Sequence, residues 1–527
     1  MKAALVYCPF FTNGDYPPLG MACVNGALKE SGHESACFDF AWLASRESAE
    51  EFHLIREFFA VNRVKDEVVF ALAPELGLFL LYGEDDRKFK WQLNYDAEFK
   101  PAAIALCLSL WNKMPKWAET VLAQKPDAAL FSTYSSNCFV SLYMAKLLKK
   151  SRPDLPVIFG GPGASLPALG EFILSTGFVD GLVVGEGEDT VRELCADLKK
   201  NLEHGVPGLA ILKGKKMACE PRPLTADLDS LPRANFDGLP FPGQEFKAYR
   251  TGGMFSGHAW EGFPISSTRG CVNQCAYCSE SVYWRKFRQR KPENIVADMK
   301  EIFNRFGEKT FAFNDSSLNG KPGWLEKFCE RLKALEFKPR FWCYLIPNQS
   351  ITDQLAKTLF ESGFLDVTLG VETFSGSIRN RISKGMEGEE ILCAILSLTR
   401  AGINVTANLL VGFPGETDSE FESSMDYIRR WDKMKESERG PGNLHFEAGH
   451  RVRVEAYSRF FQNPEKFGIK ISPYEIPIPE SLSDLKQSLS KILLRARMSV
   501  DEKTIAQRCA RMRKLASKTK KNLKLPS

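Results

Sequence analysis

The stretch Arg269-Gly-Cys-Val-Asn-Gln-Cys-Ala-Tyr-Cys-Ser-Glu280 places three cysteines, Cys271, Cys275 and Cys278, in one short segment. Three thiolates this close together can bind three irons of a [4Fe-4S] cluster. No fourth cysteine follows at the spacing found in ferredoxins, so the fourth iron would stay open for a small ligand. An apolar run at residues 263–267 comes directly before the stretch and predicts a strand that leads into it.

The alternative chemistry for such cysteines is a structural zinc site. Zinc sites usually pair two cysteine clusters or add histidines at short spacing. Residues 279–290 contain neither cysteine nor histidine. The sequence therefore favours the iron-sulfur cluster over zinc.

The composition is that of an ordinary globular protein. The chain has 527 residues, 44% hydrophobic and 26% charged, a length that allows two or three domains. Its N-terminus lacks the features of a signal peptide, and no apolar run reaches membrane-spanning length. Most of the fourteen cysteines are scattered singly, as reduced core residues would be. We therefore expect a soluble cytoplasmic protein.

The net charge of +5 is a property of the C-terminal tail. Residues 503–527 contain nine lysines or arginines and no acidic residue, so the rest of the chain carries a net charge of about −4. A solvated terminal helix accounts for this tail, and we expect no nucleic-acid partner.

The N-terminal part alternates apolar strands with amphipathic helices. Alternation of this kind predicts an α/β fold with a parallel, doubly wound, Rossmann-like sheet, whose ligand lies at the carboxyl ends of the strands. A mostly helical insertion of unassigned role spans about residues 41–124. The predicted strands are residues 3–7, 34–40, 128–132, 157–160 and 181–184, with a helix at 19–31.

A proline-rich stretch at residues 206–255 predicts an extended linker between this domain, residues 1–205, and a second one. A second alternating series follows in residues 256–470, and a basic, helical C-terminal region covers residues 471–527. The strands expected in the second series are residues 263–267, 310–314, 340–345, 365–371, 405–411 and 451–457.

The cysteine spacing, with an aromatic residue before the last cysteine, resembles the signature of the radical SAM superfamily. The resemblance implies a partial (β/α)6 barrel, open on one side to a large substrate. It also implies that the open iron binds S-adenosylmethionine (SAM), and that one electron from the cluster cleaves SAM to methionine and a 5'-deoxyadenosyl radical.

Segments at the expected strand ends extend this resemblance over about 200 residues. They are Asn314-Asp-Ser-Ser-Leu-Asn-Gly320, Leu369-Gly-Val-Glu-Thr373 and Val411-Gly-Phe-Pro-Gly-Glu-Thr417. The family likeness implies SAM contacts from these segments and from the aromatic residue of the cysteine motif. The implied SAM-binding residues are Tyr277, Asp315, Glu372, Gly412 and Pro414.

The N-terminal domain resembles cobalamin-binding domains, in which D-x-H-x-x-G follows the first strand. Asp15-Tyr-Pro-Pro-Leu-Gly20 stands there, with a proline in the histidine position, so a protein histidine as lower axial ligand is not expected. The alternative is a domain that keeps the fold without the cofactor. The implied cobalamin-binding residues are Asp15, Pro17, Gly20, Ser132, Gly160, Gly161, Gly185 and Gly187.

Together the two resemblances imply a cobalamin-dependent radical SAM enzyme, most similar to methyltransferases that act on unactivated carbon or phosphorus. A cyclase or rearrangement enzyme, with cobalamin or with a vestigial cobalamin domain, is the first alternative, and a non-catalytic cobalamin or SAM sensor is the second. A methylthiotransferase fits less well, because it would need three more cluster cysteines in the N-terminal domain and a C-terminal RNA-binding barrel, and the residues after Ile471 lack the strand pattern of such a barrel. The expected partners are an unknown small molecule or biosynthetic intermediate and a low-potential electron donor, flavodoxin or ferredoxin.

Overall fold

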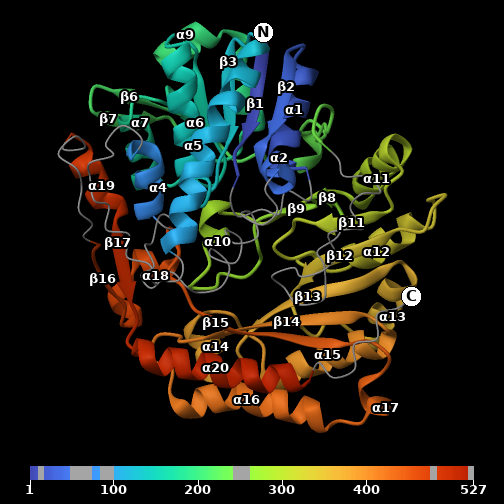
Figure 1. Cartoon of the computed structure of the whole chain (residues 1–527). Helices are drawn as coiled ribbons and strands as arrows, with labels where there is room; N and C mark the ends of the chain where they lie inside the picture. Colours follow the sequence, from blue (N-terminus) through green and yellow to red (C-terminus); the bar gives the residue numbers. More distant parts are fainter. Residues whose placement is uncertain (10–16, 48–73, 84–99, 241–261, 475–483, 520–527) are drawn as a thin grey trace. The chain divides into compact units, whose positions relative to one another are not determined.

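The computed structural model describes residues 1–9, 17–47, 74–83, 100–240, 262–474 and 484–519. These residues divide into two compact units (Figure 1). The first comprises Met1–Ala226, Ser230–Tyr249 and Ile471–Ala496, and the second comprises Asp227–Asp229, Arg250–Lys470 and Arg497–Ser527.

The first unit is built on a seven-stranded sheet of order β2-β1-β3-β4-β5-β6-β7. The first five strands pair in parallel, and the last two add antiparallel to the edge. This confirms the doubly wound fold and all five predicted strands. The strands are β1 (Lys2–Tyr7), β2 (Glu34–Asp39), β3 (Ala128–Ser132), β4 (Val157–Gly160), β5 (Gly181–Val183), β6 (Leu209–Lys213) and β7 (Lys216–Cys219).

Helices cover this sheet, and they also occupy the described parts of the predicted insertion. Helix α1 packs against α8, whereas α4, α5 and α6 pack against one another and α19 packs on α7. The helices are α1 (Leu19–Glu30), α2 (Phe40–Glu47), α4 (Pro74–Tyr82), α5 (Lys100–Ala123), α6 (Cys138–Ser151), α7 (Pro167–Ser175), α8 (Glu188–Ala196), α9 (Leu198–His204) and α19 (Lys486–Ile492).

The predicted linker begins as part of the sheet, because its first residues form the hairpin β6–β7. Residues 233–237 are then held on α1 by Asn25, whose amide donates hydrogen bonds to the carbonyls of Asn235 (2.9 Å) and Asp237 (3.2 Å). Gly26 permits this contact, since a Cβ there would lie 1.9 Å from the carbonyl oxygen of Arg233. Residues 241–255 of the linker lie outside the described residues.

The second unit contains a six-stranded parallel sheet of order β15-β14-β13-β12-β11-β8. Strands of β-α-β units in simple sequential order are the pattern of a partial (β/α) barrel, as predicted. The strands are β8 (Phe263–Ile265), β11 (Thr310–Phe313), β12 (Arg340–Leu345), β13 (Phe364–Glu372), β14 (Asn404–Val411) and β15 (Leu444–Arg451).

A row of helices packs side by side along this sheet (Figure 1). Local sequence sets their ends: α11 starts with Pro292 and ends at left-handed Gly307, and a Thr417–Glu420 capping box starts α16. The helices are α11 (Pro292–Phe306), α12 (Trp324–Leu332), α13 (Asp353–Glu361), α15 (Gly388–Ala401) and α16 (Asp418–Lys433), with the short α10 (Glu280–Tyr283), α14 (Gly376–Arg381), α17 (Glu436–Arg439) and α18 (Arg459–Gln462).

The sixth barrel strand was placed wrongly by the sequence. It is β15, which ends at Arg451, so that residues 452–457 follow the sheet and form no strand. The apolar residues of 451–457 favoured a strand there, whereas β15 offers no continuous apolar run, since its apolar residues alternate with polar ones. Leu444, Phe446 and Ala448 are buried, and they alternate with His445 and Glu447.

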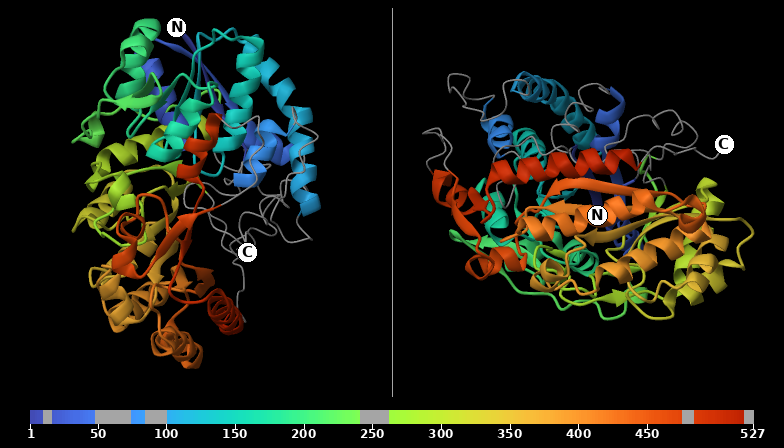
Figure 2. Two further views of the ribbon diagram at one scale, coloured as in Figure 1. Left: turned by 90° about the vertical axis from the view of Figure 1, so that its left-hand side faces the viewer. Right: turned by 90° about the horizontal axis from the view of Figure 1, so that it is seen from below.

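The basic C-terminal helix is not simply solvated, which corrects a second expectation. Helix α20 (Glu502–Lys518) packs along β15 and also contacts α16, and it runs beside the orange strands in red in Figure 2. It buries one face, formed by Ile505, Arg508, Cys509, Met512 and Ala516. This helix therefore covers the edge of the sheet.

Two small two-stranded sheets lie apart from the seven- and six-stranded sheets. Strands β9 (Thr268–Arg269) and β10 (Arg288–Gln289) pair antiparallel, and β16 (Lys470–Pro473) pairs with β17 (Leu494–Arg497). Within the described part of the chain, no helix combines the length and apolar character needed to span a membrane.

Candidate active site

The cysteine segment is a loop held at both its base and its middle. The antiparallel pair β9–β10 closes the base. In the middle, the N–H of Ala276 donates to the carbonyl of Ile382 (2.8 Å), and the carbonyl of Ala276 accepts from the N–H of Phe460 (2.9 Å). The loop that carries the cysteines is thus fixed by segments that follow β13 and β15.

Asp315 anchors the approach to this loop. Its carboxylate, 1% exposed, accepts hydrogen bonds from the N–H groups of Ser267 (2.9 Å) and Thr268 (2.7 Å) and from the hydroxyls of Ser266 (3.1 Å) and Ser267 (2.6 Å). Burial raises its pKa, and these hydrogen bonds oppose the rise. The carboxylate therefore orders residues 266–268, and its direct contact with SAM stays a prediction.

The three cysteines are free thiols in this loop. Cys275 is nearly buried, and the sulfur of Cys271 lies 3.7 Å from the hydroxyl of Ser317. Burial raises the pKa values of both Cys275 and Cys278, and the positive charge of Lys384 opposes the rise at Cys275. A cation beside a thiol favours the thiolate, the form that binds metal.

Glu372 is presented by a β-bulge at the end of β13. Between Leu369 and Glu372 the strand advances three residues while its neighbour β14 advances two, from Ala407 to Leu409. Glu372 itself has φ +67°, a left-handed conformation that is costly for a residue other than glycine. Such bulges re-aim side chains near functional sites.

Lys384 and Tyr277 meet Glu372 beside the cysteine loop. The Lys384 ammonium lies 3.4 Å from Oε1 of Glu372 and 3.1 Å from the hydroxyl of Tyr277. Gly370 keeps the space open, since a Cβ there would come within 3.1 Å of Glu372 Oε1 and 3.3 Å of Lys384 Nζ. Burial raises the pKa of Tyr277, and the charge of Glu372 adds to the rise.

Arg379 fixes the backbone around this pair. It is fully buried, and its guanidinium donates to the carbonyls of Val371 (2.6 Å) and Thr373 (3.1 Å), on either side of Glu372. It also donates to the carbonyls of Gly385 (2.7 Å) and Met386 (2.9 Å), just after Lys384. One side chain therefore holds both partners of the ion pair, a role that the sequence analysis missed.

The loop after β14 carries the remaining predicted SAM residues. Gly412 has φ +86°, and its N–H donates to Glu416 Oε2 (2.9 Å). Pro414 is buried, and the ring of the adjacent Phe413 meets that of Tyr277 edge-on, with 6.3 Å between centroids. Tyr277, Glu372 and this loop thus come together beside the cysteines, and their contact with SAM stays a prediction.

Helix α20 braces the same loop. The Arg508 guanidinium donates to the carboxylate of Glu416 (3.0 Å) and to that of Asp418 (2.7 Å), and the Ser499 hydroxyl accepts from the N–H of Gly415 (2.8 Å). Arg508 is 5% exposed, as is Glu416. The sequence showed only basic composition here, although the spacing of Ile505, Cys509, Met512 and Ala516 predicts a buried helical face.

In the first unit, the predicted cobalamin residues gather at the carboxyl edge of the sheet. Ser132 and Gly160 end neighbouring strands and are register partners. A Cβ on Gly20 would lie 3.7 Å from the Ser132 hydroxyl. A Cβ on Gly185 would have no described heavy atom within 4 Å, so the space beside this glycine is open. Pro17 is buried directly before α1, and Asp15 lies outside the described residues.

Glycines shape this edge because the backbone folds closely there. Gly161 has φ +100°, and a Cβ on it would lie 2.6 Å from the Thr133 carbonyl oxygen. Thr133, which the sequence analysis overlooked, donates through both its N–H (2.7 Å) and its hydroxyl (2.9 Å) to the Gly160 carbonyl. Gly185, with φ +86°, lies in the loop after β5, and Gly187 is the N-cap residue of α8.

His33 lies at the other edge of this sheet. It precedes β2, whose first residue, Glu34, donates to the carbonyl of Met1 (2.9 Å) at the start of β1. Its pKa is lowered by burial and by the nearby N-terminal amino group. The strands' amino ends and carboxyl ends are at opposite edges, so His33 is not near the glycine edge.

Comparison with known proteins now identifies both units. The sequence matches the family "Radical SAM superfamily" over residues 265–428 and the family "B12 binding domain" over residues 103–195. The chain therefore carries a radical SAM domain and a B12-binding domain. An uncharacterized methyltransferase of Pyrococcus horikoshii is 26% identical over 316 residues, which cover 58% of this chain and 65% of that protein, less than two thirds of its length.

Two solved structures share the fold of this radical SAM protein. The methyltransferase TsrM from Kitasatospora setae, with cobalamin and a [4Fe-4S] cluster bound, has a TM-score of 0.60 at 16% identity, covering 89% of this chain and 80% of that one. The cobalamin-dependent SAM radical enzyme OxsB, with aqua-cobalamin and SAM bound, has a TM-score of 0.65 at 13% identity, covering 97% and 66%. At such identities the likeness concerns the fold.

The residues of this radical SAM protein fit the cofactors that its family implies. Three thiols from one fixed loop suit a cluster in which each sulfur binds a different iron, and no group of three His, Cys, Asp or Glu among the described residues is arranged for a single ion. The space kept open by Gly370 suits a polar group of SAM beside Glu372. The glycine edge of the first unit suits the close approach of a large cofactor.

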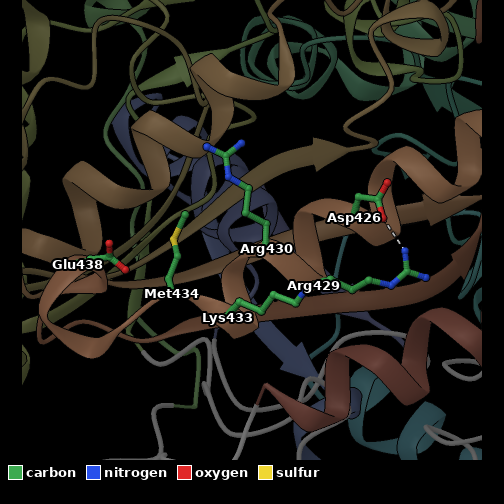
Figure 3. Close-up of a pocket in the computed structure, with 6 residues that line it drawn as sticks. All are labelled: Asp426, Arg429, Arg430, Lys433, Met434 and Glu438. Atoms are coloured by element: carbon green, nitrogen blue, oxygen red, sulfur yellow. Dashed lines mark hydrogen bonds and ion pairs between the residues drawn. The ribbon is translucent and has the colours of Figure 1, made fainter.

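A surface pocket elsewhere does not belong to this site. It is lined by Asp426, Arg429, Arg430, Lys433, Met434 and Glu438, all from α16, α17 and the turn between them (Figure 3). Arg429 is paired with Asp426 and Glu422, and Arg430 is paired with Glu389. Its two arginines are thus already engaged by carboxylates.

Proposed function

We propose that this protein is a cobalamin-dependent radical SAM methyltransferase that acts on an unactivated carbon, or a phosphorus centre, of a small-molecule substrate. The observation that carries the proposal is the convergence of the cysteine loop, Tyr277, Glu372 and the 412–416 loop at one end of the barrel. A B12-binding domain in the same chain supports the choice of methyl transfer.

The cluster and SAM would be held by residues that the sequence predicted. Cys271, Cys275 and Cys278 would hold the cluster, Glu372 would bind the amino or ribose groups of SAM, and the backbone of Gly412 would line its adenine. When bound, the cluster and SAM supply one-electron chemistry, and cobalamin supplies a methyl carrier. The chain's own contribution is to position these groups and to exclude water.

The positioning task rests on buried polar contacts. Lys384 orients the Glu372 carboxylate, Arg379 fixes the carbonyls on both sides of it, and Arg508 braces the 412–416 loop through Glu416. Because these groups are already hydrogen-bonded to protein, little reorganisation is needed when SAM enters. At the other cofactor edge, Gly160, Gly161 and Gly185 let the backbone approach cobalamin.

The test is anaerobic reconstitution of the full chain with iron, sulfide and cobalamin, followed by analysis of a reaction with methyl-labelled SAM. Formation of 5'-deoxyadenosine establishes radical SAM activity, and label in a product recovered from cell extract establishes methyl transfer. Deoxyadenosine with no transferred label favours a cyclase or rearrangement enzyme. Tight binding of both cofactors with no cleavage under reducing conditions favours the sensor.

The proposed setting follows from the cluster. A low-potential cluster needs a reducing compartment and an electron donor such as flavodoxin or ferredoxin, so we place the protein in the cytoplasm. All fourteen cysteines are free thiols, which agrees with such a compartment.

A further inference from the structure

A second β-bulge in the barrel brings three titratable side chains of β15 together. Between Glu447 and His450 the strand advances three residues while β14 advances two, from Asn408 to Leu410. Residues three apart on a regular strand point to opposite faces, and the extra residue restores the same face. Gly449, with φ +83°, is at the bulge.

The opposite face of β15 is occupied by α20. A Cβ on Gly449 would lie 2.5 Å from the side chain of Arg513 and 2.8 Å from the carbonyl of Cys509, both on that helix. Phe446 and Ala448 are buried there as well. His445, Glu447 and His450 therefore point toward the inner face of the barrel sheet.

Glu447 is bracketed by the two imidazoles. Nε2 of His445 lies 3.1 Å from one carboxylate oxygen, and Nε2 of His450 lies 2.7 Å from the other. His445 is almost fully buried, whereas His450 is 37% exposed. Burial would raise the pKa of Glu447, but the hydrogen bonds from the two imidazoles outweigh it and lower the pKa to about 2.

Tyr344 connects this cluster to the SAM site. It lies on β12, hydrogen-bonds the side chain of Asn408 on β14, and has both Glu372 and Glu447 close enough to raise its pKa further after burial. The polar inner wall thus runs from Glu372 on β13 to Glu447 on β15. Two bulges on either side of the regular strand β14 present these two carboxylates.

We infer that Glu447, bracketed by His445 and His450, is the substrate-recognition group of this enzyme and binds an amine of the substrate. The inference rests on the proposed function, because it takes the inner barrel wall as the substrate side. Active sites of such barrels are built at the carboxyl ends of the strands. His450 lies one residue before the carboxyl end of β15, and Glu447 lies on the same face in the middle of the strand.

Charge decides the class of substrate. Glu372 already has the ammonium of Lys384 beside it, whereas Glu447 pairs, among the residues that the structure describes, with the imidazoles of His445 and His450. Each imidazole donates one hydrogen bond to a different oxygen of the carboxylate. A carboxylate offers about four lone-pair positions, and two stay open here for the N–H donors of an ammonium group.

The experiment uses three probes that differ only in head group: phenethylamine, 2-phenylethanol and phenylacetate. Saturation-transfer NMR is recorded on the full chain, reconstituted with cluster, cobalamin and SAM. We expect the amine to show at least fivefold greater saturation than phenylacetate, and Glu447→Gln to remove this preference. Glu447→Asp keeps the charge and is expected to keep the preference.

Glu502→Gln is the matched control, because Glu502 pairs with Arg451 at the end of the same strand and is largely exposed. It should behave as the unaltered protein does. Equal saturation of amine and acid, no binding of the amine, or an amine preference that survives Glu447→Gln would overturn the inference. Cluster content and deoxyadenosine formation, measured on the same samples, test the proposed function separately.

Discussion

The Lys384 ammonium and the Glu372 carboxylate form an ion pair of 3.4 Å, with only 8% and 12% of their side chains exposed. One buried arginine, Arg379, fixes this pair, because its guanidinium donates hydrogen bonds to backbone carbonyls next to both residues. The carboxylate therefore has a fixed position and one open side, which is how a group that recognises SAM needs to be presented.

Glu372→Gln should weaken SAM binding while the cluster is kept. A carboxylate that accepts from an ammonium or hydroxyl makes a charge-assisted bond worth about 1.5–3 kcal/mol, or roughly 10- to 150-fold in affinity. Equilibrium binding of SAM to the reconstituted protein measures this loss. Glu420→Gln, which breaks a pair with Arg381 on the helix side, is the control. Unchanged SAM affinity in Glu372→Gln would assign this residue to structure alone.

Replacing Cys271, Cys275 and Cys278 together by alanine should abolish both the cluster absorbance and SAM cleavage. The reason is that the three thiols are the ligands supplied by the fixed loop after β8. Iron and sulfide analysis after anaerobic reconstitution provides the measurement. Cys393→Ala, at an exposed helical position, serves as the control and should retain the cluster. A full complement of iron in the triple variant would mean that other cysteines bind it.

Much of this fold could be predicted because its parallel strands are buried on both faces and appear in the sequence as short apolar runs. The strand β15 could not, because its apolar residues alternate with polar ones and form no continuous run, and the predicted strand was placed six to seven residues too late. The bulges at Glu372 and Gly449 depend on the register between neighbouring strands. No local pattern encodes that register, so the Glu447 cluster was not foreseen.

In the candidate site too, contiguous motifs could be predicted from the sequence, whereas contacts that form only in the folded chain could not. The cysteine loop is a contiguous motif and was predicted from its spacing. Arg379 makes its four carbonyl contacts only after the loops beyond β13 have folded, so its role could not be inferred from its neighbours in sequence. The hydrogen bonds of Asp315 to residues 266–268 likewise depend on the folded barrel and could not be inferred from its neighbours in sequence, while its contact with SAM stays a prediction.

Arg508→Met should destabilise the C-terminal helix strongly. Removal of one partner leaves the Glu416 carboxylate buried without its cation, and such losses typically cost about 3–5 kcal/mol. Urea unfolding of the apo protein measures the change, and the double variant Arg508→Met/Glu416→Gln should recover most of it. Arg511→Met removes an exposed arginine that pairs with Glu422, and should cost about 1 kcal/mol or less. Equal losses for Arg508→Met and Arg511→Met would contradict the bracing role.

The contribution of Glu447 to stability should disappear in acid. Its folded pKa is lowered from 4.5 to about 2, so the stabilisation is fully present above pH 4.5 and is lost as the pH falls toward 2. The difference in free energy of unfolding between the unaltered protein and Glu447→Gln should therefore shrink by about half or more between pH 6 and pH 3. Urea unfolding at the two pH values measures it. A difference that grows in acid would show that the imidazoles do not hold Glu447 ionised.

Cobalamin should bind to the first unit without a protein histidine as its lower ligand. Pro17 stands at the position where related domains have the histidine, and proline offers no lone pair to a metal. His33 cannot substitute, because it precedes β2 at the amino edge of the sheet, whereas Ser132, Gly160 and Gly185 are at the carboxyl edge.

The Co(II) form of the bound cofactor, examined by electron paramagnetic resonance under anaerobic conditions, should show no splitting from a protein nitrogen. Labelling the protein with ¹⁵N separates protein nitrogen from the cofactor's own base, and single alanine variants of the six histidines complete the set. Splitting that changes with ¹⁵N and vanishes in one of these variants would identify a histidine ligand and refute the prediction. Failure to bind any cobalamin would instead favour a domain that has kept the fold and lost the cofactor.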